Sequence, residues 1–160
     1  MTVLTPEPLT AAAFTPFGTV IQTENARSFS INQGTTMRFD QLAMAEVGEG
    51  QAAISIFRGA PRPHPIAIEM LERHPLGSQA FFPLTDHNWL VVVGSEPKGA
   101  ALRCFHARGD QGVQYSTGIW HHPLLVLNGS QDFLVVDRSG PGENLEEVVL
   151  SPGARIRLRN

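Results

Sequence analysis

The sequence predicts a mainly-β domain, an antiparallel sandwich or barrel with one or two short helices. It contains 15 glycines and 12 prolines among 160 residues, above the usual combined share of about 12%, and this excess favours many short elements joined by tight turns. Helical periodicity is almost absent, whereas short apolar runs bounded by turn-forming residues recur along the chain. About ten such strands without crossover helices indicate antiparallel sheets.

The individual elements follow from local signals. Thr10 precedes an alanine run and predicts a capped helix at residues 9–14, and residues 40–47 predict one or two further helical turns. Asn128-Gly129 predicts a hairpin between residues 124–127 and 133–136, because both residues tolerate positive φ. The proline-rich segment 60–65 is a stiff connection into the next strand. Strands are expected at residues 17–22, 35–39, 51–58, 65–74, 78–82, 89–94, 101–106, 112–115, 123–127, 132–137, 145–149 and 154–158.

Length and composition are those of a single domain, residues 1–160. Hydrophobic residues make up 42% of the chain, enough for a core, which excludes general disorder. The net charge of −3 lacks the basic excess of nucleic-acid-binding domains. No apolar run approaches the ~20 residues of a membrane span, and no signal peptide is visible. The single cysteine, Cys104, alternates with Leu102 and His106 and is expected to pack as a small hydrophobe. We therefore expect a soluble, cytoplasmic protein.

Residues 65–74 carry the first candidate site. Alternate residues of a strand share a face, so one face would carry Ile66, Ile68, Met70, Glu72 and His74. Burying this face inside a barrel would place Glu72 and His74 at the mouth of a cavity, above an apolar floor. The alternative is an exposed strand end, where polar residues cost nothing.

Two further segments supply polar groups to the same interior. Gln79, with Phe81 on its face, would point inward from the neighbouring strand. His121 and His122 are consecutive, so only one of them can reach the cavity if they lie in a strand. A lone histidine packed in the core is the alternative for that pair.

Together, Glu72-x-His74-x4-Gln79 and Gly118-x2-His121 resemble the two motifs of the cupin family. That family uses a His-x-His-x4-Glu segment and a later Gly-x2-His segment to hold a divalent metal in a β-barrel, whereas here Glu72 and Gln79 replace the first His and the Glu. The resemblance implies a double-stranded β-helix, or jelly roll, with a metal held by Glu72, His74, Gln79 and His121. Two imidazoles with two oxygen donors suit a borderline metal, Ni²⁺ foremost and Mn²⁺ or Zn²⁺ next. No organic cofactor is implied.

A closer resemblance, to the ureidoglycolate lyase family, rests on segments spread over most of the chain. They are residues 31–34 running to Arg38, residues 71–81, Trp120-His121-His122-Pro123 and Val136-Asp137-Arg138. The resemblance implies a homodimer that cleaves (S)-ureidoglycolate, a small-molecule substrate, to glyoxylate and urea in allantoin and purine catabolism. No nucleic-acid or membrane partner is implied.

The implied reaction needs an acid and a base with pKa values near neutrality, which His supplies best. We assign His74 and His121 to these roles, directly or through a bound metal. Glu72 would orient a histidine or the metal, and Gln79 would bind the ureido carbonyl. Tyr115 could donate to an oxyanion, although buried tyrosines more often bond to a backbone carbonyl.

The substrate carboxylate calls for a cation, preferably an arginine fork. The open candidates are Arg38, Arg73 and Arg103. Arg73 alternates with His74, so it would need a bulge or a dimer contact to reach the site. Arg58 and Arg138 are expected to pair with acidic residues at the surface or an interface.

Three other hypotheses about the function are also consistent with the sequence. The domain could bind a small carboxylate or sugar without catalysis. It could be a metal-dependent oxygenase or isomerase, because Glu72, His74 and His121 supply the donor types of non-haem iron sites. It could also hydrolyse ureidoglycolate and release ammonia in place of urea.

Overall fold

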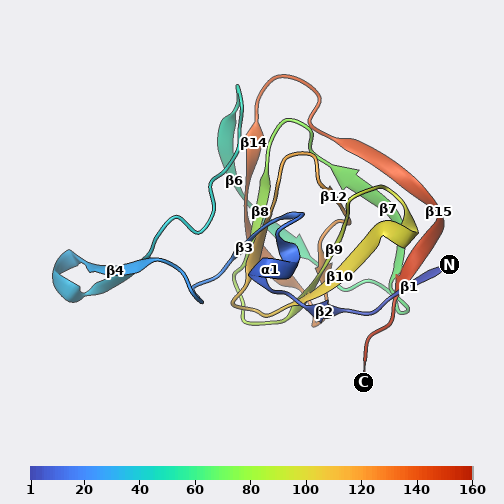
Figure 1. The fold of residues 1–160 in the computed structure, drawn as a ribbon, viewed down its shortest axis with the longest axis horizontal. Helices are drawn as coiled ribbons and strands as arrows, with labels where there is room; N and C mark the ends of the chain where they lie inside the picture. Colours follow the sequence, from blue (N-terminus) through green and yellow to red (C-terminus); the bar gives the residue numbers. More distant parts are fainter. Residues whose placement is uncertain (160) are drawn as a thin grey trace.

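The computed structural model describes residues 1–159 and confirms the mainly-β fold (Figure 1). The eight-stranded sheet has the order β1 (Thr2–Leu4), β15 (Glu146–Ile156), β7 (Ala67–Arg73), β12 (Trp120–His121), β9 (Trp89–Gly94), β10 (Leu102–Ala107) and β2 (Glu7–Pro8), with β13 (Leu125–Val126) also paired to β9. The five-stranded sheet has the order β3 (Gly18–Ile21), β11 (Gly112–Tyr115), β8 (Gln79–Pro83), β14 (Gln131–Ser139) and β6 (Gln51–Gly59).

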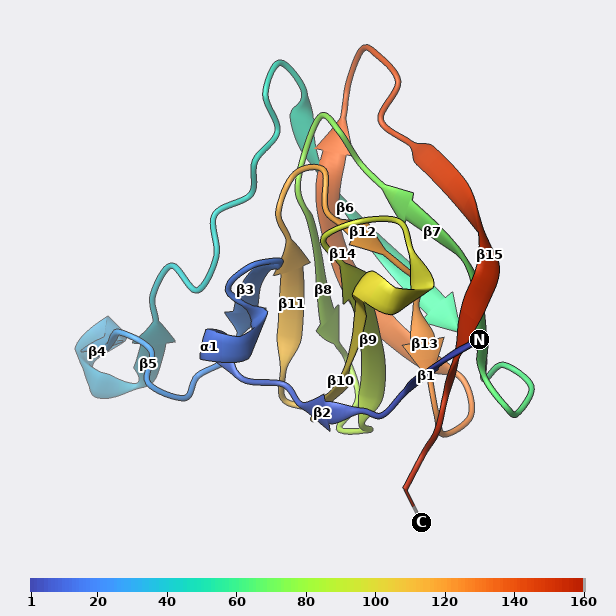
Figure 2. The ribbon, with the colours of Figure 1, turned by 45° about the vertical axis from the view of Figure 1, so that its right-hand side comes forward.

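The chain alternates between these two sheets. After β7 in the larger sheet it enters β8 in the smaller one, returns for β9 and β10, and repeats the crossing through β11, β12 and β14. The pairings are antiparallel except for β1 with β15 and β2 with β10. The curled sheets face each other as an open barrel (Figure 2). This is the cupin-type jelly-roll arrangement that the sequence predicts.

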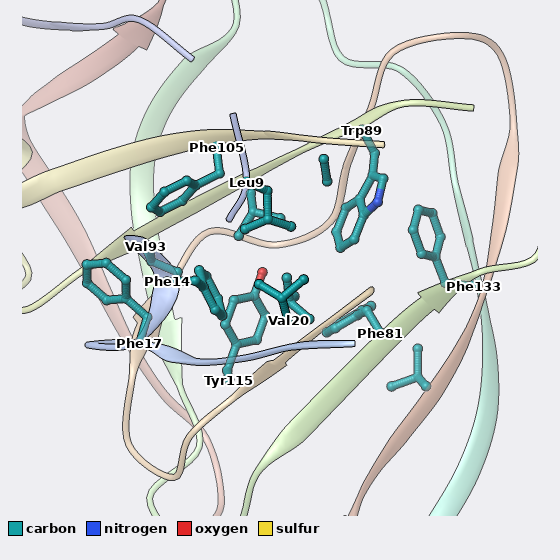
Figure 3. Packing of buried hydrophobic residues seen from close by; sticks show 14 of the residues in the cluster. Leu9, Phe14, Phe17, Val20, Phe81, Trp89, Val93, Phe105, Tyr115 and Phe133 are labelled. Carbon is teal, nitrogen blue, oxygen red and sulfur yellow. The ribbon is translucent and has the colours of Figure 1, made fainter. Parts of the chain in front are cut away.

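Two apolar cores lie on opposite faces of β9. Trp89, Val91 and Val93 pack into the first core, between the two sheets (Figure 3). Leu90 and Val92 pack into the second core, with residues of β1, β7, β10 and β15. A strand buried on both faces requires a continuous apolar run, and the sequence of β9 is such a run.

The helices are short, as predicted. Helix α1 (Ala11–Phe14) is capped by Thr10, whose hydroxyl accepts a hydrogen bond from the Ala13 N–H; the 3-10 helices are η1 (Asn32–Gly34) and η2 (Gly99–Ala101). The helix predicted at 40–47 is wrong, because these residues form an irregular segment. The carbonyl of Met44 in this segment accepts a hydrogen bond from the Gln114 side chain at 2.8 Å. No helix in residues 1–159 is long and apolar enough to cross a bilayer.

One predicted strand connection is also wrong. Asn128-Gly129 does not close a hairpin, because β13 pairs with β9 in the larger sheet and β14 pairs with β6 and β8 in the smaller one. Gly129 does have a positive φ of 66°, so the turn signal was sound but the partner strand was not. The strands predicted at 145–149 and 154–158 are both present within β15, which has a register shift between Val149 and Ala154.

The predicted alternation along β7 fails at one point. Ile68 and Leu71 are both fully buried in the second core, so the side-chain phase changes between them, opposite a register shift between Val149 and Ala154 of β15. Glu72 consequently does not share a face with Ile68. The irregularity that reverses the inward face of β7 lies here.

A two-stranded hairpin projects from the barrel (Figures 1 and 2). Its strands β4 (Ser28–Ile31) and β5 (Thr36–Phe39) pair only with each other. Phe29, Met37 and Phe39 on this hairpin are 36%, 55% and 41% exposed.

Candidate active site

Glu72, His74 and His121 converge at the adjacent strands β7 and β12 of the larger sheet, beside Tyr115 of the smaller sheet. Their ligand atoms all lie within 4.8 Å of one another. His121 stands directly opposite Glu72 in the pairing of β12 with β7, and its Nε2 is 3.4 Å from Oε1 of Glu72. The ring centroids of His74 and His121 are 5.3 Å apart. The structure thus brings these three candidate residues into one cluster.

Gly118 helps to hold the two histidines together. Its backbone N–H donates to the carbonyl oxygen of His74 at 2.9 Å, and its φ is 80°, a conformation that glycine adopts at little cost. This bond ties the turn before β12 to the residue that follows β7. The positive φ and the bond to His74 therefore explain why a glycine occupies this position of the Gly-x2-His motif.

Both imidazoles are held through Nδ1 by a backbone carbonyl oxygen. Nδ1 of His74 lies 2.8 Å from the carbonyl oxygen of Asn144, and Nδ1 of His121 lies 2.9 Å from that of Ile119. Because a carbonyl only accepts, Nδ1 carries the proton and Nε2 of the neutral ring has a free lone pair. Both Nε2 atoms are buried without a hydrogen-bond partner among residues 1–159. Metal-binding histidines are commonly oriented in this way.

Glu72 supplies the negative charge of the cluster. The neighbouring His121 side chain lowers the pKa of its carboxyl group, against the opposing effect of burial, so Glu72 is a carboxylate at neutral pH. Two imidazoles and a carboxylate are a donor set that divalent transition metals accept. The free Nε2 atoms and the charge of Glu72 therefore fit a divalent metal.

Gln79 and Tyr115 lie beside each other on β8 and β11. The Tyr115 ring stacks on His121, with centroids 4.1 Å apart and planes 11° apart, and its hydroxyl points into the first core (Figure 3). Burial raises the pKa of Tyr115, so the hydroxyl stays protonated. Nε2 of Gln79 donates to Asp137 at 3.2 Å, and its buried Oε1 has no partner in the described chain. Tyr115 thus supports His121 through its ring, and Gln79 keeps a free acceptor.

A cavity of about 420 Å³ opens at Glu72, within the ~300–1,000 Å³ range of small-molecule sites. Arg62 also lines it. Its apolar wall is formed by Phe57, Phe81, Pro123 and Leu124. A small polar molecule in this cavity would meet the Glu72 carboxylate, a cation and hydrocarbon.

The three arginines predicted to bind a carboxylate do not line this cavity. Each is engaged with an acidic side chain elsewhere: Arg38 with Asp40, Arg73 with Glu146 and Arg103 with Glu7. Arg73 also lies over the Trp120 ring, 4.5 Å from its centroid. Within one chain, the structure therefore does not bring Arg38, Arg73 or Arg103 to the cluster.

Two other arginines were expected to pair with acids. Arg58 does so, with bonds of 2.8 and 3.1 Å to Asp132. Arg138 instead donates to the backbone carbonyls of Val47 and Pro141, so it holds loops together.

His122 and Cys104 are not part of the cluster. Nδ1 of His122 lies 2.8 Å from the Pro123 carbonyl, and burial lowers its pKa to about 4, so this ring is neutral. Only one of the adjacent histidines joins the cluster, as strand alternation predicts. Cys104 is a buried free cysteine, and burial raises the pKa of its thiol to about 12. It packs as the predicted small hydrophobe.

Sequence reasoning missed three contributors to the site: Arg62, Asp137 and the Asn144 carbonyl. Asn144 acts through its backbone, which leaves no signal in the sequence. Asp137 had been noted only within a matching segment. Arg62 was detectable, because it stands between Pro61 and Pro63 in the rigid segment that leads into β7.

The fold and the cluster define a cupin-type barrel with a candidate metal centre. The family model described as ureidoglycolate lyase matches residues 1–157. The chain belongs to the ureidoglycolate lyase family.

Individual relatives agree with this assignment. A protein of Burkholderia mallei (strain NCTC 10229) named ureidoglycolate lyase is 52% identical over 151 residues, covering 92% of this chain and 89% of the relative. Its namesake in Pseudomonas fluorescens (strain Pf-5) is 49% identical over 163 residues, covering 99% and 98%. Among solved structures, one of oxalate decarboxylase gives a TM-score of 0.43 at 11% identity, covering 90% of this chain and 30% of that chain.

Proposed function

We propose that this protein is a ureidoglycolate lyase, an enzyme that cleaves (S)-ureidoglycolate to glyoxylate and urea in the catabolism of allantoin. The observation that carries the proposal is the convergence of Glu72, His74 and His121 in one cluster, of which Glu72 lines a cavity. It occurs in a chain whose relatives are named for this activity.

The substrate carries a carboxylate, a hydroxyl and a ureido group on one carbon. In the elimination, a base takes the hydroxyl proton and the O–H electron pair becomes the carbonyl bond of glyoxylate. The C–N bond breaks, its electron pair stays on the departing nitrogen, and that nitrogen takes up a proton to give urea. The atoms balance without water or an oxidant.

The cluster can supply each of these proton movements. Nε2 of one imidazole accepts the hydroxyl proton, and the other imidazole, which must enter the reaction protonated at Nε2 as well as Nδ1, donates its Nε2 proton to the ureido nitrogen. The Glu72 carboxylate, 3.4 Å from His121, stabilises positive charge on that ring. The sequence led us to expect that Gln79 binds the ureido carbonyl, but its Nε2 is bonded to Asp137, so we propose that its free Oε1 accepts a ureido N–H.

We also propose that Glu72, His74 and His121, with Oε1 of Gln79, hold a divalent metal, Ni²⁺ in preference to Mn²⁺ or Zn²⁺. When bound, such a metal supplies a Lewis acid that lowers the pKa of the substrate hydroxyl. With a metal bound, the two Nε2 atoms, Glu72 and Oε1 of Gln79 would be its ligands, so the metal would replace the direct proton transfer by the imidazoles described above. The three unpartnered buried atoms, on His74, Gln79 and His121, support this proposal.

The deciding experiment measures urea and ammonia together as the purified protein consumes (S)-ureidoglycolate, against the uncatalysed decay. Urea without ammonia is expected. Ammonia in its place would indicate a hydrolase, and neither product above background would indicate a binding module. His74→Ala and His121→Ala should lower turnover by about 10²-fold or more, with the fold preserved, whereas the exposed His87→Ala should not.

We further propose a homodimer whose interface includes the β4–β5 hairpin. A lone two-stranded hairpin is marginally stable in water, and this one exposes Phe29, Met37 and Phe39. Light scattering should give twice the chain mass of 17.4 kDa, and the double variant Met37→Asp/Phe39→Asp should be monomeric. A monomeric wild type would refute the dimer.

A cytoplasmic location is likewise proposed and is checked by cell fractionation.

A further inference from the structure

We propose that Arg62 is the residue that binds the substrate carboxylate; this inference rests on the proposed function. Arg62 lines the cavity that begins at Glu72. A planar guanidinium can hold a carboxylate through two parallel hydrogen bonds. Ureidoglycolate and its product glyoxylate both carry such a carboxylate.

Arg62 is the uncommitted cation of this cavity. Among residues 1–159, no carboxylate oxygen lies within 4.0 Å of its guanidinium nitrogens, whereas Arg58 on the same wall is held by Asp132 in a bidentate pair. The guanidinium of Arg62 is therefore free to bind a substrate carboxylate, whereas that of Arg58 already binds Asp132.

The backbone around Arg62 is stiff. Pro61 and Pro63 fix φ on either side of it. Gly59, where the segment begins, lets the chain approach β13 closely, because a Cβ there would come within 3.0 Å of Leu124 and 3.1 Å of Val126. A guanidinium on such a segment loses less backbone freedom when a ligand binds.

The charges of the cavity fix one orientation of the substrate. The Glu72 carboxylate repels a second carboxylate, and Arg62 attracts it. With its carboxylate on Arg62, the substrate turns its hydroxyl and ureido groups toward Glu72, the cluster residue that lines the cavity. The apolar wall of Phe57, Phe81 and Leu124 lowers the local polarity and strengthens the ion pair.

The test compares wild type, Arg62→Ala, Arg62→Lys and Arg58→Ala in steady-state urea release from (S)-ureidoglycolate. Arg62→Ala should raise KM and lower kcat/KM by about 10- to 100-fold, the effect of losing a charge-assisted hydrogen bond. Arg62→Lys should recover only part of this loss, because lysine offers a point charge without the fork. Arg58→Ala removes the same charge from the same wall and should leave KM within about twofold, because its carboxylate partner is Asp132.

A second readout separates this inference from the proposed function. Glyoxylate binding is measured by calorimetry on the metal-loaded proteins, with neutral glycolaldehyde as the comparison ligand. Arg62→Ala should weaken glyoxylate binding about 10-fold or more and leave glycolaldehyde binding unchanged. Unchanged KM and glyoxylate affinity in Arg62→Ala, or equal losses in Arg58→Ala, would overturn the role of Arg62. A wild type that releases no urea but loses glyoxylate binding in Arg62→Ala would refute the lyase and keep the carboxylate site.

Discussion

The stacking of Tyr115 on His121 makes different predictions for the ring and the hydroxyl of this residue. Tyr115→Phe keeps the ring, which is 5% exposed, and removes only the hydroxyl that points into the core (Figure 3). We expect kcat/KM to stay within about threefold of wild type, a barrier change under ~1 kcal/mol.

Tyr115→Ala removes the ring itself. Loss of a buried aromatic side chain costs about 3–5 kcal/mol, a large part of the ~5–15 kcal/mol by which native domains are stable. His121 also loses its planar neighbour at 4.1 Å, and a misplacement of about 1 Å at a reacting group lowers turnover by roughly 10²-fold. Urea denaturation followed by tryptophan fluorescence gives the first quantity, and urea release gives the second.

Val113→Ala is the matched control, because Val113 is buried on the same strand and in the same core. It should lower stability while kcat stays near wild type. If Tyr115→Phe were as inactive as Tyr115→Ala, the hydroxyl would take part in the chemistry. If folded Tyr115→Ala kept wild-type kcat, the ring would not position His121.

Three further outcomes are expected. Glu72→Gln keeps the shape and removes the charge, so kcat/KM should fall about 10- to 100-fold; unchanged kinetics would contradict its role. Chelation and dialysis should lower both activity and metal content measured by mass spectrometry, and Ni²⁺ should restore activity better than Mn²⁺ or Zn²⁺, whereas a fully active metal-free protein would exclude the metal. Cys104 should react with a thiol reagent only after unfolding. Its folded pKa of about 12 lies above the ordinary 9.0, so stability should fall by up to ~1.4 kcal/mol per pH unit as the pH rises past 9, and Cys104→Ala should reduce that slope.

The strands could be read from the sequence because each depends on local signals. The apolar run of β9 and the turn residues around β11 and β14 mark the elements within a few residues. Strand pairing depends on contacts between distant segments. Asn128-Gly129 therefore predicted a turn correctly and a hairpin wrongly, and residues 40–47, rich in helix formers, follow a tertiary contact at Met44 in place of a helix.

The candidate site, like the strands, was predictable where it depends on local sequence signals and not where it depends on contacts between distant residues. Motif spacing placed Glu72, His74 and His121 together, even though the phase change in β7 invalidated the shared face with Ile68. The arginines could not be sorted, because the sequence does not show which of them already has an acidic partner. Arg73 and Arg103 have one, and Arg62 in the described chain does not.

The carboxy-terminal strand has a consequence for how the enzyme is made. β15 pairs with β7 and also with β1. The strand that carries Glu72 therefore has its outer neighbour only once residues 146–155 are in place. A ribosome-bound chain that stops before Asn144 also lacks the carbonyl oxygen that fixes the ring of His74. The cluster of Glu72, His74 and His121 is therefore completed late in synthesis.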